Sequence, residues 1–388
     1  MIFPEEHKIM KTYEHSLCQF YKCMASECPD NCCKGWQVPI DEKTYDRYRS
    51  LEGIFGRHVR SFVKKKSDPK VFRRCLGVCP FFTSDRLCLF QCTGREELMP
   101  LVCREFPKQV VTMGDRCEVS LLFSCPAVTR MFLDHLGPGT YVESNREYDP
   151  YYSIGNEDEA FLAFLLGERE KIVSYIWEEP RRPLGQVWQS LYAYVRTQHQ
   201  YLMRNCVRDK VKDVILTDDK EKQGEYALVT DPGVCFFKIT TLDRMILNHI
   251  DYGWLQIRDP KLYRLIRIYT RKISQLPLDR AELWFHEQVT KLMEEAPEYE
   301  EKYRSYFSYL IQQLYPMAYE NYFMLRQLLF AILYVQLLMM FDLMDHLATG
   351  RVADKDRQAE ILLMTEKALR HNQSLTDNLL TVIRQEFL

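Results

Sequence analysis

The chain contains fourteen cysteines, and no other residue type is spaced in a way so suited to chemistry. Twelve of them lie between Cys18 and Cys125, and only Cys206 and Cys235 lie in the rest of the sequence. Zinc ions and iron–sulfur clusters both require several thiolates that converge on one point. The distribution therefore predicts a thiolate site for zinc or an iron–sulfur cluster in the first third of the chain.

A disulfide framework is the alternative use of so many thiols. The first residues, Met1 to Lys8, lack the cationic start and apolar run of a secretory signal. Disulfide-stapled domains are usually short and secreted, whereas 388 residues can build a core without staples. We therefore expect a cytoplasmic protein whose cysteines hold a metal or cluster rather than form disulfides or serve as incidental thiols, and the vicinal Cys32 and Cys33 can both be ligands.

The choice between zinc and an iron–sulfur cluster rests on spacing. Zinc sites usually show paired C-x2-C knuckles, which this sequence does not contain. It contains instead three C-x3-C spacings, at Cys28/Cys32, Cys75/Cys79 and Cys88/Cys92. Proline follows three thiols, as in Cys79-Pro80, which is typical of bacterial ferredoxin runs. These features favour an iron–sulfur cluster of the 4Fe-4S type, with zinc as the alternative.

The elements that must position these thiols change character once along the chain. Residues 1–136 are rich in cysteine and turn residues, whereas residues 140–388 follow helical patterns. We predict a mainly α protein with an irregular cysteine-rich, cluster-binding domain over 1–136 and a mainly helical domain over 140–388 that can form a substrate cleft. In the first domain we expect short helices over Asp41–Leu51, with Asp41 as N-cap, and over Phe55–Lys66. Evidence for strands is thin.

The second domain shows several helical segments. One apolar stripe comprises Leu184, Val187, Trp188, Leu191 and Val195. We predict two long helices, Tyr299–Tyr315 and Asn321–His346, which are separated at Pro316. A final helix is predicted over Asp354–Phe387. Asp218–Lys222 is predicted as a loop, and Val234–Phe237 as a short buried strand or part of a helix.

Two features of the sequence concern a membrane and nucleic acid as possible partners. The most apolar run, Leu328–Phe341, is shorter than the roughly 20 residues of a membrane-spanning helix, so we predict a core helix and no membrane insertion. The net charge of −2 and the pI near 6.5 give no general reason to expect nucleic acid as a partner. The basic run Lys64-Lys65-Lys66 is interpreted as a solvated face.

Residues outside the cysteines offer weaker candidates for chemistry. His15 is a possible ligand or base, although a lone histidine is more often structural, and Trp36 is interpreted as the seal of a small core. Glutamates between Glu294 and Glu301 either attract a lysine-bearing partner or favour a helix dipole. The nucleotide-binding pattern G-x-G-x-x-G is absent, and Gly137-Pro138-Gly139 is the nearest glycine cluster. The C-x3-C-x2-C triad of radical enzymes is also absent.

Six motifs in series resemble one protein family. They are Phe20-x2-Cys23-x4-Cys28-x3-Cys32-Cys33-Lys34-Gly35-Trp36, Asp41-x2-Thr44-Tyr45-x2-Tyr48, Cys79-Pro80-Phe81, Leu87-Cys88, Cys103-Arg104-x-Phe106-Pro107 and Ser124-Cys125-Pro126. Their order and spacing resemble the flagellin lysine N-methylases, the FliB family, and more loosely the zinc- or iron-chelating cysteine-cluster domains. The resemblance covers about Tyr13 to Arg130 and is weaker beyond, where Arg370-His371-Asn372 is similar to a helix segment of the family.

The resemblance implies an enzyme that methylates flagellin lysines with S-adenosylmethionine and carries an iron–sulfur cluster. It carries over eight metal-ligand candidates: Cys23, Cys28, Cys32, Cys33, Cys79, Cys88, Cys103 and Cys125. It does not clearly carry over Cys18, Cys75, Cys92, Cys117, Cys206 or Cys235. Lys108 stands where the family pattern suggests arginine. The catalytic base and the residues that bind the methyl donor stay unassigned.

Three functions of different classes follow from the sequence. The first is a protein-lysine methylase that acts on flagellin by direct displacement, with a structural cluster. The second is a protein that binds and delivers metal or clusters without methylase activity. The third is an interaction module in which the cysteine site is only a staple. A bound methyl donor would distinguish the first from the others.

Overall fold

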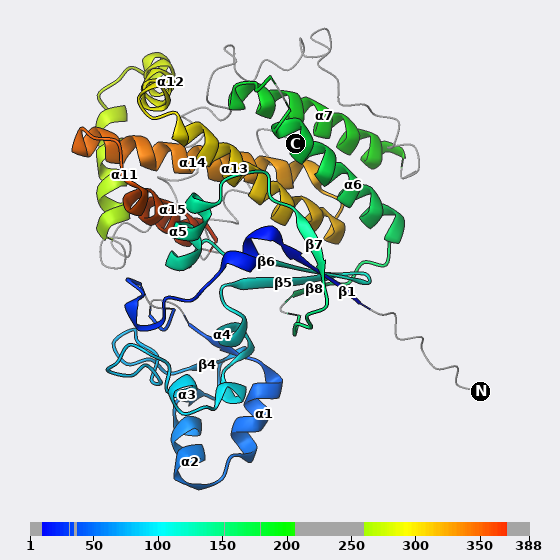
Figure 1. Ribbon diagram of the computed structural model, residues 1–388, viewed down its shortest axis with the longest axis vertical. Coiled ribbons are helices and arrows are strands. Elements are labelled where there is room, and N and C mark those ends of the chain that lie inside the picture. The colour runs from blue at the N-terminus through cyan, green and yellow to red at the C-terminus, as the bar shows by residue number, and fades with distance from the viewer. Residues whose placement is uncertain are drawn as a thin grey trace. The chain divides into compact units, whose positions relative to one another are not determined.

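The structure, a computed structural model, describes residues 10–30, 32–34, 37–150, 152–178, 180–205 and 260–370. The chain forms two compact units (Figure 1). The cysteine-rich unit contains the residues up to Met131 and Tyr141–Ser153, and it carries all the described cysteines. The helical unit contains Phe132–Thr140 and the residues from Ile154 onward. The mainly helical fold class is confirmed, but the N-terminal part contains more strand than the sequence suggested.

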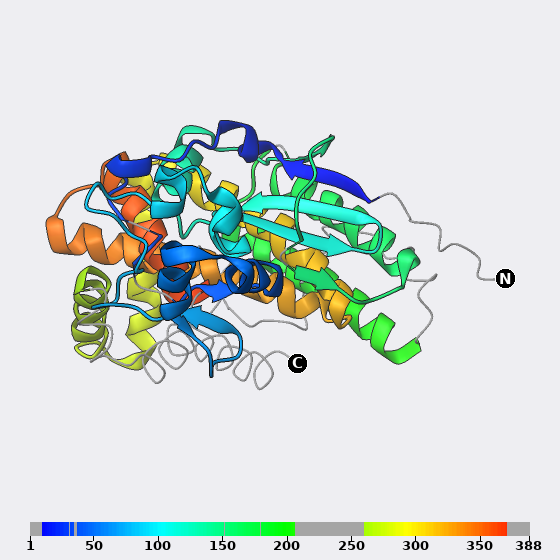
Figure 2. The same cartoon turned by 90° about the horizontal axis from the view of Figure 1, so that it is seen from below.

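Five strands form the larger sheet, in the order β7-β1-β6-β5-β8, and Figure 2 shows the blue strand β1 close to the cyan strands of this sheet. They are β1 (Lys11–His15), β5 (Lys108–Met113), β6 (Arg116–Leu121), β7 (Tyr141–Ser144) and β8 (Tyr152–Ile154). Strands β5 and β6 make a hairpin whose last pair is Met113 opposite Arg116, which leaves Gly114 and Asp115 as a two-residue loop. Gly114 has a φ of +59°, a conformation that glycine adopts without steric cost.

The rest of the cysteine-rich unit consists of short elements. A three-stranded sheet has the order β2-β4-β3, with β2 (Pro39–Ile40), β3 (Val63–Lys64) and β4 (Lys70–Phe72). The helices are α1 (Glu42–Ser50), α2 (Gly53–Ser61), α3 (Leu89–Cys92) and α4 (Leu101–Glu105), with 3-10 turns η1 (Ser16–Phe20), η2 (Ala25–Glu27) and η3 (Glu96–Leu98).

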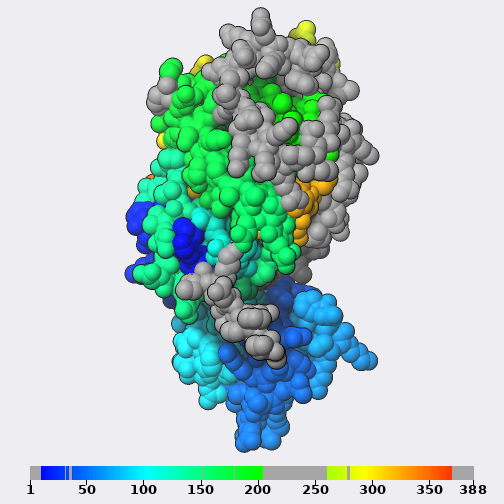
Figure 3. All heavy atoms as spheres, turned by 90° about the vertical axis from the view of Figure 1, so that its right-hand side faces the viewer, coloured from blue at the N-terminus to red at the C-terminus, as the bar shows by residue number. Residues whose placement is uncertain are grey.

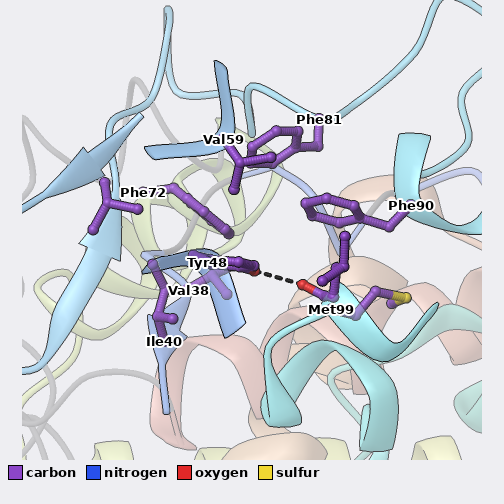
Figure 4. Packing of buried hydrophobic residues seen from close by; sticks show 10 residues of the cluster. Val38, Ile40, Tyr48, Val59, Phe72, Phe81, Phe90 and Met99 are labelled. Atoms are coloured by element: carbon purple, nitrogen blue, oxygen red, sulfur yellow. Dashed lines mark hydrogen bonds between the residues drawn. The ribbon is translucent and has the colours of Figure 1, made fainter. Parts of the chain in front are cut away.

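Aromatic rings hold these short elements together (Figure 4). The ring centroids of Phe81 and Phe90 are 4.5 Å apart, and those of Phe72 and Phe81 are 4.9 Å apart. The ring of Tyr48 packs against Phe72 and Phe90, and all four side chains are buried. Cys79, Cys88 and Cys103 pack against the same cluster, so the core and the thiols are built together.

The first predicted helix is confirmed, and the second is too long. Asp41 caps α1 by accepting a hydrogen bond from the Thr44 amide at 2.9 Å. Helix α2 ends at Ser61 rather than Lys66, because Val63 pairs with Phe72 across the β3–β4 ladder and both side chains become buried. Burial of these side chains therefore overrides the local helical pattern.

The helical unit contains longer elements. These are α6 (Glu159–Ile176), α7 (Leu184–Asn205), α11 (Pro260–Ile273), α12 (Leu278–Glu295), α13 (Glu298–Leu314), α14 (Met324–Thr349) and α15 (Lys355–Arg370), with the 3-10 turn η5 (Tyr315–Glu320) between α13 and α14. The predicted break at Pro316 is confirmed, since this proline lies in η5. The predicted stripe on α7, from Leu184 to Val195, is buried as expected.

Helix α14 is the centre of the helical unit. Helices α7, α11, α12, α13 and α15 all contact it, and Gly350 ends it in a left-handed C-cap. By length and composition α14 could cross a membrane, but its most apolar window is completely buried within the protein. This burial confirms the predicted core helix around Leu328–Phe341.

Several predictions fall outside the described residues. These concern Trp36, the segments Asp218–Lys222 and Val234–Phe237, the pair His371-Asn372 with the end of the final helix, and Cys206 and Cys235.

Candidate functional site: the cysteine cluster

The eight predicted ligand cysteines come from separate pieces of the chain. Cys23 and Cys28 flank η2, and Cys32 and Cys33 lie in the following turn. Cys79 follows the Cys75–Val78 turn, Cys88 directly precedes α3, Cys103 lies in α4, and Cys125 precedes α5 (Pro126–Asp134). All described cysteines are thiols and none forms a disulfide with another.

Three thiols form the centre of the site. Cys33 exchanges side-chain hydrogen bonds with Cys32 and Cys79, and the Cys79 amide donates to the Cys33 carbonyl oxygen at 2.9 Å. The hydrogen bond with Cys33 lowers the pKa of Cys32 to about 7, and it lowers the pKa of Cys79 to about 7 as well. Because the thiolate is the form that binds metal, Cys32 and Cys79 are prepared for a soft cation, whereas the same hydrogen bonds raise the pKa of the Cys33 thiol.

Cys88 and Cys103 extend the centre to a group of five thiols. Burial raises the pKa of Cys88, and the nearby charges of Cys79 and Cys32 raise it further. Burial also raises the pKa of Cys103, with additional contributions from Cys79, Cys32 and Cys88. These groups therefore repel one another when ionised, and a bound cation would relieve that repulsion.

A second group of three thiols lies beside the first. Burial raises the pKa of Cys125 to about 11, and the charges of Cys28 and Cys23 add to the effect. Tyr21 connects the two groups: burial raises the pKa of its hydroxyl, followed by the charges of Cys125, Cys23 and Cys32. Tyr21 thus lies within electrostatic range of Cys32 in the first group and of Cys23 and Cys125 in the second.

The donor chemistry fits a thiophilic group, but the side chains do not enclose one. Among the described residues, no three Cys, His, Asp or Glu side chains are arranged so that they could hold a metal ion. Cys79, Cys88 and Cys103 are held by the aromatic core, whereas Cys32 and Cys33 lie in a turn. The set provides the ligand atoms for a zinc ion or an iron–sulfur cluster without a closed coordination shell.

Helix α1 fixes the position of Cys103 through the backbone of the Leu98–Leu101 segment. Tyr48 Oη donates to the Leu98 carbonyl oxygen at 2.5 Å, and Thr44 Oγ1 donates to the Met99 carbonyl oxygen at 3.5 Å. The Leu101 amide donates to Asp41 Oδ2 at 2.8 Å. Since Leu101 begins α4, the motif Asp41-x2-Thr44-x3-Tyr48 acts as a support for one of the thiols.

The four other described cysteines lie apart from this set. Cys75 and Cys92 are exposed, and Cys117 is buried in strand β6. Burial raises the pKa of Cys18 to about 12, and its thiol donates to the Val119 carbonyl oxygen at 3.6 Å.

The remaining candidates of this unit have structural contacts. His15 is buried, and its Nδ1 accepts a hydrogen bond from the Leu17 amide at 3.1 Å, so it caps η1. Lys108 lies over the ring of Tyr148, 4.7 Å from the centroid, and Arg104 pairs with Asp149 at 3.2 Å. The contacts named here join these side chains to backbone, aromatic or acidic groups and to none of the eight cysteines.

The acidic residues near the start of α13 form ion pairs within the helical unit. Glu301 pairs with Arg181, and Glu300 pairs with Arg304 at 2.8 Å. The turn Gly137–Gly139 follows α5 rather than a strand, so it is not a nucleotide-binding loop.

Buried polar groups of the helical unit were not anticipated from the sequence. Lys302 Nζ lies 2.7 Å from Asp342 Oδ2 and 3.9 Å from the ring centroid of Tyr299, and both charged side chains are almost fully buried. Glu168 accepts hydrogen bonds from Tyr194 at 2.6 Å and Gln198 at 2.8 Å. The sequence signal for the Lys302–Asp342 pair is Asp342, an acidic residue directly after the apolar run that ends at Phe341.

Three curated proteins are similar to the chain. Two are named lysine-N-methylase, from Salmonella typhimurium and Salmonella choleraesuis, and each is 31% identical over 121 residues, which is 29% of this chain and 30% of the relative. The third is the flagellar biosynthetic protein FliU of Salmonella muenchen, 30% identical over 121 residues, which is 29% of this chain and 72% of that protein. The match thus spans less than a third of the two methylases. No family model and no solved structure matches the chain.

Proposed function

The chain belongs to the family of these relatives, the FliB family, and on that premise we propose that it is a protein-lysine N-methyltransferase that uses S-adenosylmethionine and acts on flagellin. The similarity to two proteins named lysine-N-methylase carries the proposal. The name of FliU links the family to the flagellum and supports flagellin as the substrate.

The proposed reaction is a direct displacement. The neutral lysine amine attacks the methyl carbon of the sulfonium, so that the N–C bond forms as the C–S bond breaks, and S-adenosylhomocysteine leaves with the sulfur electron pair. The amine must lose its proton first, because an ammonium group has no free electron pair. Electrons are not exchanged with any redox centre in this reaction, so an iron–sulfur cluster is not required for the transfer itself.

We propose that the thiols hold an iron–sulfur cluster whose task is structural, with zinc as the alternative. The group Cys32, Cys33, Cys79, Cys88 and Cys103 supplies enough sulfur ligands for one 4Fe-4S cluster. The loops that carry these thiols contain only short elements, so a central cross-link would stabilise them more than their apolar contacts can. Anaerobically prepared protein should then contain roughly four iron and four sulfide per chain; stoichiometric zinc without iron would contradict the cluster.

The methylase proposal is tested with anaerobic, iron-replete protein, flagellin from the same organism and S-adenosylmethionine. Intact mass spectrometry should show flagellin gaining one methylene mass per transfer, on lysine peptides. The rate should rise with pH as more of the target lysine becomes neutral, since free lysine has a pKa near 10.4. Flagellin that stays unmodified, while the methyl donor binds and the metal is present, would refute the proposal and favour metal delivery.

A further inference from the structure

One stretch of the cysteine-rich unit, from Gly53 to Arg95, is strongly basic although the whole chain is not. It contains ten Lys and Arg residues and only two acidic residues, Asp68 and Asp85. The whole chain has 52 basic and 54 acidic residues, so the rest of the sequence holds 42 basic against 52 acidic residues. This stretch of 43 residues therefore carries a net charge of +8, whereas the rest of the chain carries a net charge of −10.

Five side chains of this stretch present their charge to solvent. Lys64, Lys65 and Lys66 lie at the β3–β4 turn, Arg73 follows β4, and Arg57 lies on α2. All five are exposed, and the ion pairs found in the described part of this unit involve other residues. We name these five residues the basic surface.

Most other cations of the stretch have a neutral partner. Arg60 Nη1 donates to the Tyr48 carbonyl oxygen at 2.9 Å, and Lys70 Nζ donates to the Ser67 carbonyl oxygen at 3.0 Å. The guanidinium of Arg95 lies 4.2 Å from the ring centroid of Phe55. Since these partners carry no negative charge, they do not neutralise the positive field of the region.

The β3–β4 hairpin gathers much of the basic surface in one place. Lys64 pairs with Val71 in the ladder, and the Arg73 amide donates to the Phe62 carbonyl oxygen at 2.6 Å, so both ends of the hairpin are fixed. Strand β3 is an edge of its sheet: it pairs with β4 on one side, and within the described residues no strand pairs with its other side. Figure 3 shows light blue chain of this region at the surface, with one segment that projects from it.

An exposed apolar residue lies at the border of the basic surface. Leu76 is 98% exposed in the Cys75–Val78 turn, three residues after Arg73, and has a φ of +49°. Leucine rarely adopts this left-handed backbone conformation, and here its side chain contacts solvent instead of a core. A partner that covers the basic surface could bury this side chain as well.

We propose that the basic surface is the docking site for an acidic segment of the protein substrate, with Leu76 as an apolar contact at its edge. The identity of the partner as the substrate rests on the proposed function. Lysine at an edge strand also prevents unwanted strand pairing, but this role concerns β3 and does not explain Arg57 or Arg73. Single-stranded nucleic acid is less suited, because the described part of the stretch exposes no Phe, Tyr or Trp ring as a platform on which successive bases could stack.

The test measures binding without methyl transfer. The full chain, metal-loaded and without methyl donor, is titrated into a fluorescein-labelled Asp/Glu-rich peptide, and anisotropy gives the affinity at several salt concentrations. The triple variant K64Q/K65Q/K66Q should bind the peptide up to about tenfold more weakly than the wild type, and its affinity should depend less on salt. L76S should weaken binding at high salt as well, because an apolar contact is not screened.

A matched variant controls for net charge. R264Q/R267Q/R271Q removes three exposed arginines from α11 in the helical unit and should leave peptide affinity unchanged. Equal losses in both triple variants, or no peptide binding by the wild type, would overturn the proposal. The proposal would also be overturned if duplex DNA of the same charge bound more tightly than the peptide and this DNA binding were lost in K64Q/K65Q/K66Q. Peptide binding that follows the prediction while flagellin stays unmethylated would contradict only the proposed function.

Discussion

The two units of this protein obtain their stability by different means. In the cysteine-rich unit, α1 to α4 are four to nine residues long, and the core around Tyr48 is a cluster of ten buried residues. In the helical unit, helices of 14 to 26 residues surround the central helix α14. Since small cores rarely supply enough stability, the cysteine-rich unit is expected to need a cross-link and the helical unit is not.

The units also differ in how they satisfy buried polar groups. In the cysteine-rich unit, Thr44 and Tyr48 donate to backbone carbonyl oxygens, and Cys33 bonds to neighbouring thiols. In the helical unit, a complete ion pair between Lys302 and Asp342 is buried. A zinc ion or iron–sulfur cluster bound by the thiols, as proposed, would stabilise the first arrangement, whereas the second depends only on the pairing of two charges within the chain.

The largest expected effect is the loss of the cysteine centre. Cys33→Ser removes the thiol that bonds to both Cys32 and Cys79, so bound metal should be lost and the cysteine-rich unit should unfold. Structural metal sites contribute on the order of 10 kcal/mol to the folding of small domains. Hydrogen exchange read by mass spectrometry should show lost protection around Tyr48 and Val59, with α13 and α14 still protected.

Cys92→Ser is the matched control for this prediction. Cys92 lies on α3, close to Cys88 in the sequence, but it is exposed and outside both thiol groups. This variant should keep its metal content and its exchange protection. Equal losses in Cys92→Ser and Cys33→Ser, or protection around Tyr48 that persists without metal, would show that the two units do not differ in the proposed way.

The next largest effect is expected in the helical unit. Asp342→Ala leaves Lys302 buried without its carboxylate, and breaking a buried pair in this way costs about 3–5 kcal/mol. Asp134→Ala breaks the exposed pair with Lys355 and should cost less than about 1 kcal/mol. Urea unfolding followed by far-UV circular dichroism measures both. Similar midpoints for the two variants would mean that the buried pair contributes no more than a surface pair.

The double variant Lys302→Met/Asp342→Leu separates the pair from its surroundings. Replacing both charges with apolar side chains of similar volume should restore most of the stability that Asp342→Ala loses, because no uncompensated charge stays buried. A double variant as unstable as Asp342→Ala would instead indicate that the shape of the site, including the ring of Tyr299 over Lys302, is what matters.

The sequence predicted those parts of the fold that depend on local patterns. Apolar spacing identified α7 through residues such as Trp188, Pro316 marked the break between α13 and α14, and Asp41 marked the start of α1. The hairpin β5–β6 was missed because both its faces are buried, so the strands lack the alternation that marks a half-buried strand. A Val-Val-Thr segment followed by Gly114-Asp115 was the available signal.

The sequence provided the candidate cysteines of the site but not the way in which they group in space. The motifs selected eight cysteines, whose electrostatic contacts divide them into two groups, and their role as ligands stays a prediction. Their division into a group of five and a group of three depends on the long-range contact of the turn at Cys33 with Cys79 and on the placement of Cys125 near Cys28. Spacing along the chain contains no information on such contacts, and the same is true of the buried pair Lys302–Asp342.

The smallest effect concerns the support that α1 gives to the cysteine centre. Asp41 accepts hydrogen bonds from the amides of Thr44 and Leu101, so one carboxylate caps α1 and also holds the start of α4, which carries Cys103. Asp41→Ala should therefore cost about 1 kcal/mol, the usual value for a lost N-cap, and should loosen α4 before other elements. Partial burial raises the pKa of Asp41, but these hydrogen bonds outweigh it and leave the pKa below its ordinary value.

The sign of the pH dependence follows from this lowered pKa. A carboxyl group whose pKa is lower in the folded state stabilises the fold above its unfolded pKa, near 3.9, and loses this contribution as the pH falls through the folded value. The stability difference between wild type and Asp41→Ala should thus be full at pH 7 and shrink below about pH 4. Asp41→Asn keeps a capping oxygen without the charge, so its stability at pH 7 should lie between the two, with a smaller pH-dependent difference. Because the thiols are common to all three proteins, urea unfolding of each at several pH values isolates the carboxylate. A wild-type advantage that stays constant down to pH 3 would show that the Asp41 carboxylate does not stabilise α1 and α4 through its charge.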